Sequence, residues 1–559
     1  MLFLLLGVAT YRLGWPAVIG RMRACPITLP FMMSLLIAGT GTLYSPDPYR
    51  AKIKLALLIT AFVLYAFALL LSHELPSPNG WLIGLAIGAG AAALHALYLQ
   101  WTGNAAALAS LKQYRIYDTV MQAELIRTLE ANRAMGRFAN PNHLAGYLIL
   151  GLWPLWALWR ESPKKVIRCW VGASGGLFLL VAIYRTYSRS GLIVLMASLL
   201  LLAAYEYIRS GKKFPIRMVL TIAVALLLLG AGAVLIFKDR ILGGRLLTFS
   251  TVAARFHFYR GGFLMLRDHP WFGTGTEGFE SYYCEYLRPG DLESRYVHNI
   301  VLEAADEGGV LGLFIFFWTA CAILRFLVFA WKSCQSGKTM IFAAFGSVLT
   351  LFTLSLVDFH NNLMEMLLIP AVLLGWVGGK FSRAESNYHL SKRIAYGFSA
   401  GMALTGLVFV FFPFLNIQAR ENGGYLLLDG QKAAARSAYE RAVLFDRTDA
   451  ESWNQLSRIW ADIPTISARE RSLECAQQAA RWAPRRASLR ADYANALFTL
   501  GYTDLAIQEM RKAQQLFPAR PQYHSLLADY YQALGRTSEV KLEQQIADEL
   551  QRQIEARKP

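Results

Sequence analysis

Charged residues are scarce in this sequence. Asp, Glu, Lys and Arg make up 17% of its 559 residues, against 55% hydrophobic residues and a mean hydropathy of +0.33. A chain this apolar does not fit an ordinary soluble globular domain. The composition therefore indicates a membrane protein.

Cysteine is scarce as well. The six cysteines show neither the paired spacing of metal ligands nor the pattern of a disulfide framework. This argues against a zinc site and against a cysteine nucleophile. We expect no metal and no cofactor.

Acidic residues are outnumbered by basic ones, 38 to 56, which gives a net charge of +18. Such an excess on a soluble domain would suggest a nucleic-acid partner. However, residues 417–559 hold 20 Lys and Arg and 18 Asp and Glu, so +16 of the charge belongs to the apolar part of the chain. Much of it lies in short loops between apolar runs. This is the positive-inside pattern of membrane proteins, and no nucleic-acid partner is expected.

Apolar runs of membrane-spanning length recur about twelve times. The first is predicted to be a span rather than a signal peptide, because Arg12 interrupts it and no small-residue cleavage site follows. We therefore expect an all-α, polytopic membrane protein. The predicted spans are 2–18, 28–45, 54–72, 81–100, 143–159, 169–184, 191–208, 218–237, 310–331, 339–357, 362–379 and 394–416.

The basic loops predict a topology in the bacterial inner membrane. They lie at 160–168, 209–217, 332–338 and 380–393, and we take them as cytoplasmic. The periplasmic segments are then 101–142, Tyr184–Ser190, the long loop 238–309, Asp358–Asn362 and the tail. The loop 46–53 resists this scheme, because it must be periplasmic although it carries Arg50 and Lys52.

The tail, residues 417–559, has the pattern of a tetratricopeptide-like α-solenoid. Gly501 and Gly535 lie 34 positions apart, and neighbouring Ala and Leu positions share this period. An ordinary helical bundle is the alternative. Because repeat arrays bind partners and seldom catalyse, we expect a binding role for the tail. The expected domains are N-terminal spans 1–130, a membrane domain 131–416 and the tail; a cut near residue 420 should leave the membrane part intact.

Two arginines occupy a short turn between predicted spans. If the helix continues through YRTYSRSGL, Arg185 and Arg189 are i and i+4 and lie on one face. Forked guanidinium donors suit a diphosphate. Snorkelling to lipid headgroups is the alternative.

Three more arginines, Arg255, Arg260 and Arg267, alternate with apolar residues in a pattern typical of a helix on the membrane surface. Binding anionic headgroups without a catalytic role is the alternative. The FGTG at 272–275 and the nearby aromatic residues are candidates for a sugar-stacking rim or for an interfacial belt.

His298 stands just before a short amphipathic segment that ends at Gly308–Gly309. Asn299 is a natural helix N-cap, which leaves His298 at the mouth of the turn. Because histidine titrates near neutral pH, it can take a proton from an attacking hydroxyl. A lone histidine is more often structural.

Polar residues also mark two other predicted periplasmic helix ends. VDFHNN contains Asp358 and His360, and GRFANPNHLAG contains Asn142 and His143. Capping is the more frequent role for such asparagines. Asp358 is a candidate to orient His298 or an arginine.

These motifs resemble the O-antigen ligase and polymerase superfamily over roughly residues 130–380. His298, Asn299 and Leu302 with Gly309 and Gly312 match its H-N-x-x-L and G-x-x-G pattern. The segments SRSG at 188–191 and FANPNHLA at 138–145, and the run from Arg255 through Pro270 to GTG, resemble further family segments.

The resemblance implies a GT-C-like, inverting and metal-independent transfer of a glycan from undecaprenyl diphosphate to an acceptor hydroxyl. It makes His298 the base or the group that positions the acceptor, and it makes Arg189 and Arg255 the diphosphate ligands, with Arg260 and Arg185 in support. Asn299, Asp358 and Asn142 are further supporting residues.

The acceptor stays open among lipid A core, the growing polysaccharide and a protein hydroxyl, as in O-oligosaccharyltransferases. The tail is unlike the commonest lipid A ligases, and Ile193 replaces a family leucine. A lipid-linked glycan transporter and a non-catalytic scaffold are the competing functions. The scarcity of ionisable residues inside the spans argues against the transporter.

Overall fold

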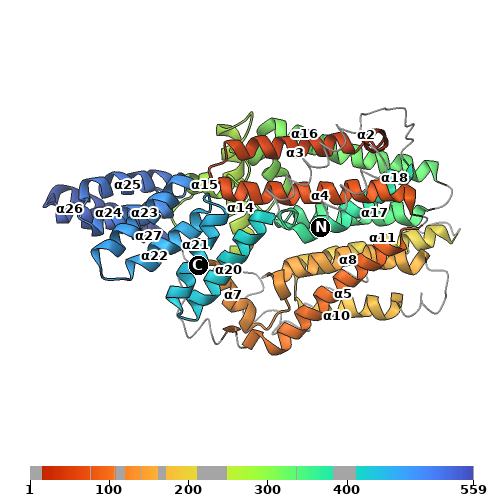
Figure 1. Cartoon of the computed structure of the whole chain (residues 1–559), viewed down its shortest axis with the longest axis horizontal. Helices are drawn as coiled ribbons and strands as arrows, with labels where there is room; N and C mark the ends of the chain where they lie inside the picture. The colour runs from red at the N-terminus through yellow and green to blue at the C-terminus, as the bar shows by residue number, and fades with distance from the viewer. Residues whose placement is uncertain are drawn as a thin grey trace.

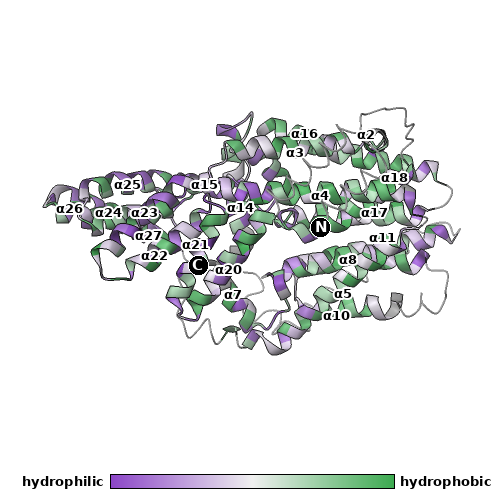
Figure 2. Ribbon diagram, viewed as in Figure 1, coloured by the Kyte–Doolittle hydropathy of each residue, from purple (hydrophilic) through white to green (hydrophobic). Residues whose placement is uncertain are grey.

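The computed structural model describes residues 15–75, 77–105, 107–108, 120–138, 140–161, 171–210, 249–334, 337–381 and 411–557. Every regular element within these ranges is a helix. Long helices form a bundle at one end of an elongated molecule, and shorter ones form a tail at the other (Figure 1). The bundle is predominantly hydrophobic and the tail is mixed (Figure 2). The predicted all-α membrane protein with a helical tail is confirmed.

The bundle is organised around α8, whose first seventeen residues are mostly buried. α8 packs against α5, α10, α11 and α17. Trp153 of α8 is fully buried and donates from its indole to Thr350 Oγ1 at 2.9 Å. The bundle helices are α2 (Trp15–Ala24), α3 (Thr28–Leu43), α4 (Pro48–Glu74), α5 (Asn79–Thr102), α8 (Pro141–Glu161), α10 (Gly176–Arg185), α11 (Arg189–Arg209), α16 (Ile300–Ser333), α17 (Lys338–Ser355) and α18 (Met364–Phe381).

Six described helices are long and apolar enough to cross a membrane, and a seventh span results if the bent pair α2 and α3 counts as one. Of the twelve predicted spans, 218–237 lies outside the described residues, and 2–18 and 394–416 lie largely outside them. The run 143–159 forms α8, which is not among the six, and 169–184 yields only the short apolar helix α10.

The charged loops lie at the two opposite ends of the bundle. Lys380 donates to the carbonyl of Leu75 at 3.3 Å, so the loop after α4 lies at the same end as the basic loop after α18. At the opposite end, Lys52 in the first turn of α4 pairs with Asp446 of the tail. The basic residues that resisted the predicted topology thus lie beside the tail, where carboxylates pair with them.

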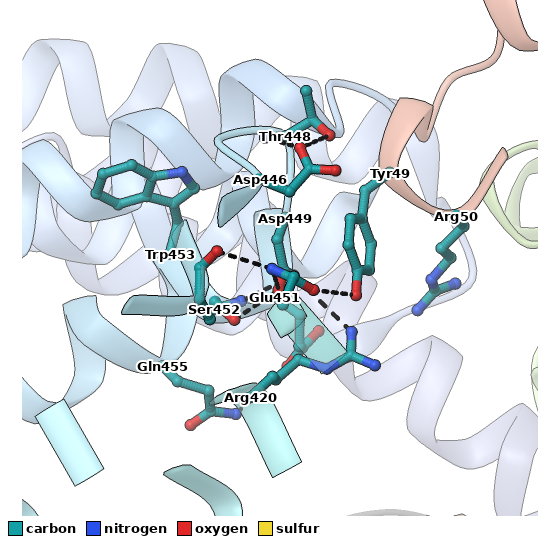
Figure 3. A network of polar contacts seen from close by, with 12 residues as sticks. Tyr49, Arg50, Arg420, Asp446, Thr448, Asp449, Glu451, Ser452, Trp453 and Gln455 are labelled. Atoms are coloured by element: carbon teal, nitrogen blue, oxygen red, sulfur yellow. Dashed lines mark hydrogen bonds and ion pairs between the residues drawn. The ribbon is translucent and has the colours of Figure 1, made fainter. Parts of the chain in front are cut away.

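A buried polar network joins the start of α4 to the tail (Figure 3). Asp449 has no exposed surface and accepts from Ser452 N at 3.2 Å and Asn416 Nδ2 at 3.1 Å, with Arg420 at 3.9 Å. Asn416 accepts in turn from the Tyr49 hydroxyl at 2.6 Å. Asp449 also caps α22 (Ala450–Ala461), so one carboxylate satisfies a helix end and an interdomain contact.

The tail is a series of helical hairpins. Gly501 and Gly535 adopt φ of 86° and 70° in equivalent turns between paired helices, at the predicted 34-residue spacing. The helix α20, which starts the tail, crosses the predicted boundary at 416/417. The tail helices are α20 (Phe412–Leu428), α21 (Lys432–Phe445), α22, α23 (Ile466–Trp482), α24 (Ala487–Thr499), α25 (Thr503–Leu516), α26 (Pro521–Ala533) and α27 (Thr537–Ala556).

The tail and the long loop share one hydrophobic core. Phe258, Tyr283 and Val297 belong to the same buried cluster as Leu527 and Tyr530 of α26. Arg485 of the tail stacks over Tyr282, with its guanidinium carbon 3.8 Å from the ring centroid, and Arg485 also pairs with Glu285. A cut near residue 420 would remove 14 of the 21 buried residues of this core, so the structure does not support the expectation that the membrane part stays intact after it.

α16 breaks at Gly309, which has φ 62° and ψ −153°. The FGTG strap fills the break: Thr274 N donates to Asp306 O at 2.7 Å, Gly275 N donates to Glu307 O at 3.2 Å, and Val310 N donates to Pro270 O at 2.7 Å. The predicted break at Gly308–Gly309 is present. The backbone of residues 270–275 thus forms the hydrogen bonds that the kink leaves open. The side chains of Trp271 and Phe272 at its start are largely exposed.

We predict that Gly309→Ala destabilises the protein by about 3 kcal/mol or more. This backbone conformation is open almost only to glycine, and an added Cβ would lie 2.4 Å from the carbonyl carbon of Trp271. Thermal unfolding in detergent measures the loss. Gly84→Ala is the control, because nothing lies within 4 Å of its added Cβ; equal melting temperatures for both variants would contradict the prediction.

We predict that Tyr283→Ala loosens the tail. Tyr283 is 1% exposed in the shared core, and truncating a large buried aromatic side chain costs about 3–5 kcal/mol. Faster proteolytic release of the tail than in wild type is the expected observation. Tyr425→Ala, at a 68% exposed position of α20, should not change the release. Unchanged proteolysis of the Tyr283 variant would mean that this core does not hold the tail.

Candidate functional site

Four segments meet at the tail end of the bundle. They are α14 (Phe249–Asp268), the turn before α16, the turn between α17 and α18 that contains η4 (His360–Asn362), and the start of α8. α14 lies between the bundle and the tail in Figure 1. Asp358, 3% exposed, is the side chain on which these segments converge.

His298 is bound to Asp358. Its Nδ1 lies 3.0 Å from Asp358 Oδ1. His298 has φ of 57°, a left-handed conformation that is rare for a residue other than glycine and often marks functional sites. The side chain of Asn299 caps α16 by accepting from Val301 N and Leu302 N, and its Nδ2 donates to Leu356 O at 3.1 Å. Asn299 thereby fastens the histidine turn to the end of α17.

Two aromatic rings fix the plane of the imidazole. Phe258 of α14 stacks on His298 with 5.3 Å between centroids, and Phe359 meets it edge-on at 5.2 Å. The His298 side chain is 20% exposed. The ring is therefore held in one orientation while part of it stays accessible.

The other oxygen of Asp358 faces a cation. Arg255 lies 4.0 Å from Asp358 Oδ2, and Phe359 N donates to Oδ1 at 2.9 Å. Burial alone would raise the pKa of Asp358, but the imidazoles of His143, His298 and His360 around it outweigh burial and hold that pKa well below its ordinary value. Asp358 is therefore an anion near neutral pH.

Two further histidines flank the same carboxylate. His143 Nε2 lies 3.8 Å from Asp358 Oδ1. His360 is fully buried, donates from Nε2 to Asn142 O at 3.3 Å, and packs against Gly146, where an added Cβ would lie 2.8 Å from its ring. Burial lowers the pKa of His360 to about 4, so this imidazole is neutral. Sequence analysis named both residues but assigned neither a role.

Asn142 supports the site through an arginine that sequence analysis missed. Asn142 Oδ1 accepts from Arg133 at 3.4 Å, and Arg133 Nε donates to Thr186 O at 2.8 Å. Arg133 thus ties the start of α8 to the turn before α11. No spacing or motif distinguishes it, because two of its partners are the backbone carbonyls of Thr186 and Tyr187, more than 50 residues along the chain.

Arg185 and Arg189 do not share a helix face. α10 ends at Arg185, Tyr187 has φ of 51°, and Ser188 caps a new helix that begins at Arg189. The condition of a continuous helix is not met, because the Ser188 side chain accepts from Gly191 N and α11 starts there instead. Arg185 turns to Gln100 Oε1 at 3.0 Å.

Arg189 stays near the site through packing. An added Cβ at Gly191 would lie 2.7 Å from the Cβ of Ala145, two residues beyond His143. The first turn of α11 therefore lies against the first turn of α8. Arg189 is largely exposed there.

The face of α14 predicted to lie in lipid is divided. Phe258 and Met265 are buried against protein, whereas Phe256 and Phe263 are 68% and 61% exposed. Arg260 is exposed and donates to Tyr286 O at 3.4 Å, away from Asp358. Arg267 pairs with its neighbour Asp268 at 2.8 Å. Of the arginines on α14, Arg255 is the one that contacts Asp358.

The family model described as O-antigen ligase matches residues 175–317. This segment is an O-antigen ligase domain by that match. The match includes Arg189, Arg255 and His298, and it indicates a glycosyl-transferring membrane enzyme of the ligase or polymerase type. Asp358 and Asn142, which the fold brings to the same place, lie outside the matched residues.

Other comparisons add little. No curated protein matches the chain. Two solved structures are similar to part of it: "MamA MSR-1 C2", at 20% identity over 24% of this chain and 76% of that one with a TM-score of 0.22, and "Crystal structure of MamA", at 15% identity over 30% and 98% with a TM-score of 0.24. Similarity at these TM-scores decides nothing about this chain.

We predict that stability falls as the pH drops from about 6.5 to 4, by roughly 3 kcal/mol, because of His360. The pKa of His360 is about 4 in the folded protein and about 6.5 in the unfolded chain. Between these two pH values the unfolded chain binds a proton at this residue and the folded chain does not, so protonation favours unfolding. Above pH 6.5 this contribution is constant. Melting curves of wild type and His360→Asn across the window test it: the variant should lose that part of the slope, and His269→Asn should keep it. An unchanged slope in His360→Asn would contradict the assignment.

Proposed function

We propose that this chain transfers a glycan from an undecaprenyl-diphosphate carrier to an acceptor hydroxyl at the periplasmic face of the inner membrane, with inversion and without a metal. The observation that carries the proposal is the contact between His298 and the anionic Asp358. A carboxylate that accepts from Nδ1–H fixes the tautomer in which Nε2 has a lone pair. Nε2 is then the proton acceptor.

The reaction is a single displacement. The acceptor oxygen forms a bond to the anomeric carbon as the bond from that carbon to the diphosphate oxygen breaks. The hydroxyl proton passes to His298 Nε2, and the diphosphate departs with the bonding electron pair. Asp358 stabilises the imidazolium that results, since opposite charges lie 3.0 Å apart.

Cations stabilise the departing diphosphate. Arg255 is tethered to Asp358 at 4.0 Å by one edge of its guanidinium, so that other donors can reach a ligand. Arg189, at the start of α11 beside the first turn of α8, is the second diphosphate ligand in this proposal. Preorganised donors of this kind are worth most where water is scarce. Arg185 and Arg260, held by Gln100 and Tyr286, take more distant supporting roles.

Two features support the periplasmic assignment. The site lies at the tail end of the bundle, and the described residues of the basic loops gather at the opposite end, which the positive-inside rule assigns to the cytoplasm.

The tail also contributes to the hydrophobic core that contains Val297, the neighbour of the proposed base His298. We therefore propose that the tail engages the acceptor, whether glycan, lipid A core or protein, or a partner protein that presents it.

The test is release of the carrier from a synthetic undecaprenyl-diphosphate glycan by the purified protein. We predict that His298→Ala slows release about 10²–10⁴-fold through loss of the base. Arg255→Ala and Arg189→Ala should each slow it about 10²–10³-fold through loss of charge stabilisation. Asp358→Asn should slow release by up to about 10⁴-fold, because the histidine loses the carboxylate that fixes its tautomer.

Matched controls come from α14. His257, which pairs with Asp291 at 2.7 Å, and Arg267 are a histidine and an arginine outside the Asp358 cluster. His257→Ala and Arg267→Ala should keep near wild-type turnover and melting temperature. Full activity in His298→Ala would exclude it as the base. Absence of release by the folded wild-type protein would favour a lipid-linked glycan transporter or an assembly scaffold.

A further inference from the structure

A second site lies at the opposite end of the bundle. The last turns of α8, α11 and α16 and the first turn of α17 enclose a cavity of about 880 Å³. His143 lies in the first turn of α8 and Arg160 in its last, so the two sites lie about 25 Å apart. The cavity therefore has no part in the chemistry at His298.

The walls of the cavity are apolar. Tyr205 of α11 stacks on Phe342 of α17 with 4.4 Å between centroids, and Trp331 of α16 packs against both. Three of the lining residues, Ile208, Leu324 and Val328, are 60%, 53% and 45% exposed. These residues belong to α11 and α16, two of the candidate membrane spans, so the apolar wall continues onto faces suited to lipid.

The rim of the cavity is cationic. Arg160, Arg209, Lys332 and Lys338 all line it. Arg160 Nε lies 3.3 Å from Glu206 Oε1, and Lys338 Nζ lies 5.3 Å from the centre of the Trp331 ring. Among the described residues, Glu161 also lines the cavity, so that together with Glu206 two carboxylates face these four cations. The described part of the rim therefore keeps a net positive charge.

From this combination we propose that the cavity binds an anionic glycerophospholipid of the cytoplasmic leaflet. One acyl chain occupies the apolar slot beside Tyr205 and Phe342, and the headgroup phosphate lies among the rim cations. Basic pockets between spans on the cytoplasmic side are suited to such headgroups, and the volume lies within the range of about 300–1,000 Å³ usual for ligand sites. Topology alone accounts for basic loops, but it does not account for an apolar slot beneath them.

The experiment uses the full chain in phosphatidylcholine nanodiscs with and without phosphatidylglycerol. Native mass spectrometry after release from the nanodisc counts retained lipids. We expect phosphatidylglycerol to be retained in preference to phosphatidylcholine. Lys332→Gln with Lys338→Gln should weaken the affinity for phosphatidylglycerol roughly thirtyfold. Ala204→Phe, which fills the slot without changing the charge, should also abolish retention.

The matched control is Arg325→Gln, an exposed position on α16 outside the cavity lining. It removes one positive charge, as each of the two lysine substitutions does, and should leave retention unchanged, with melting temperatures verifying that each variant is folded. Equal retention of the two lipids, undiminished retention in the double variant, or an equal loss in Arg325→Gln would overturn the proposal. So would the absence of any retained lipid, which would mean that protein fills the cavity. Because the readout is bound lipid, its failure leaves the proposed transferase function untouched.

Discussion

The charge of one buried carboxylate organises the candidate site. Asp358 lies in the turn between α17 and α18, and its two oxygens meet His298 from the turn before α16 and Arg255 from α14. A buried anion without partners would be costly, so the segments that bring imidazoles and a guanidinium to it are stabilised in place. The turn, the segment before α16 and α14 are therefore mutually dependent, and displacing His298 would remove one of the partners that stabilise the buried charge of Asp358.

The hydrophobic effect makes the tail part of the same assembly. The core that begins at Phe258, directly under the ring of His298, continues through Tyr283 into α24 and α26. Ionic contacts of Lys52 with Asp446 and of Arg485 with Glu285 surround it. Exposed ion pairs contribute little each, so the shared apolar area provides most of the adhesion. A ligand on the tail would thus act on a surface continuous with the segment before α16.

The two ends of the bundle differ in how their cations are compensated. At the tail end, Arg50, Lys52 and Lys54 all pair with carboxylates of other segments. At the other end, the described residues Arg160, Arg209, Lys332 and Lys338 line an apolar cavity with only Glu161 and the neighbouring Glu206 to compensate them. The first arrangement fastens protein to protein, while the second leaves charge for an anionic lipid. The same residue types thus serve cohesion at one end and recognition at the other.

The sequence by itself determined the membrane class, the helical tail with its 34-residue period, the break at Gly309 and the identity of His298 as a candidate base. Each of these is a local pattern, a matter of hydropathy, spacing or short motif. It also named Asp358, but no local pattern gives the distance between residues 60 positions apart. Only the tertiary structure decided that Asp358 contacts both His298 and Arg255, that Arg185 is directed toward Gln100, and that Arg133 links the start of α8 to the turn before α11. Only the fold could show that the tail shares a core with the loop at 258–297, because burial depends on packing between segments that the sequence keeps far apart.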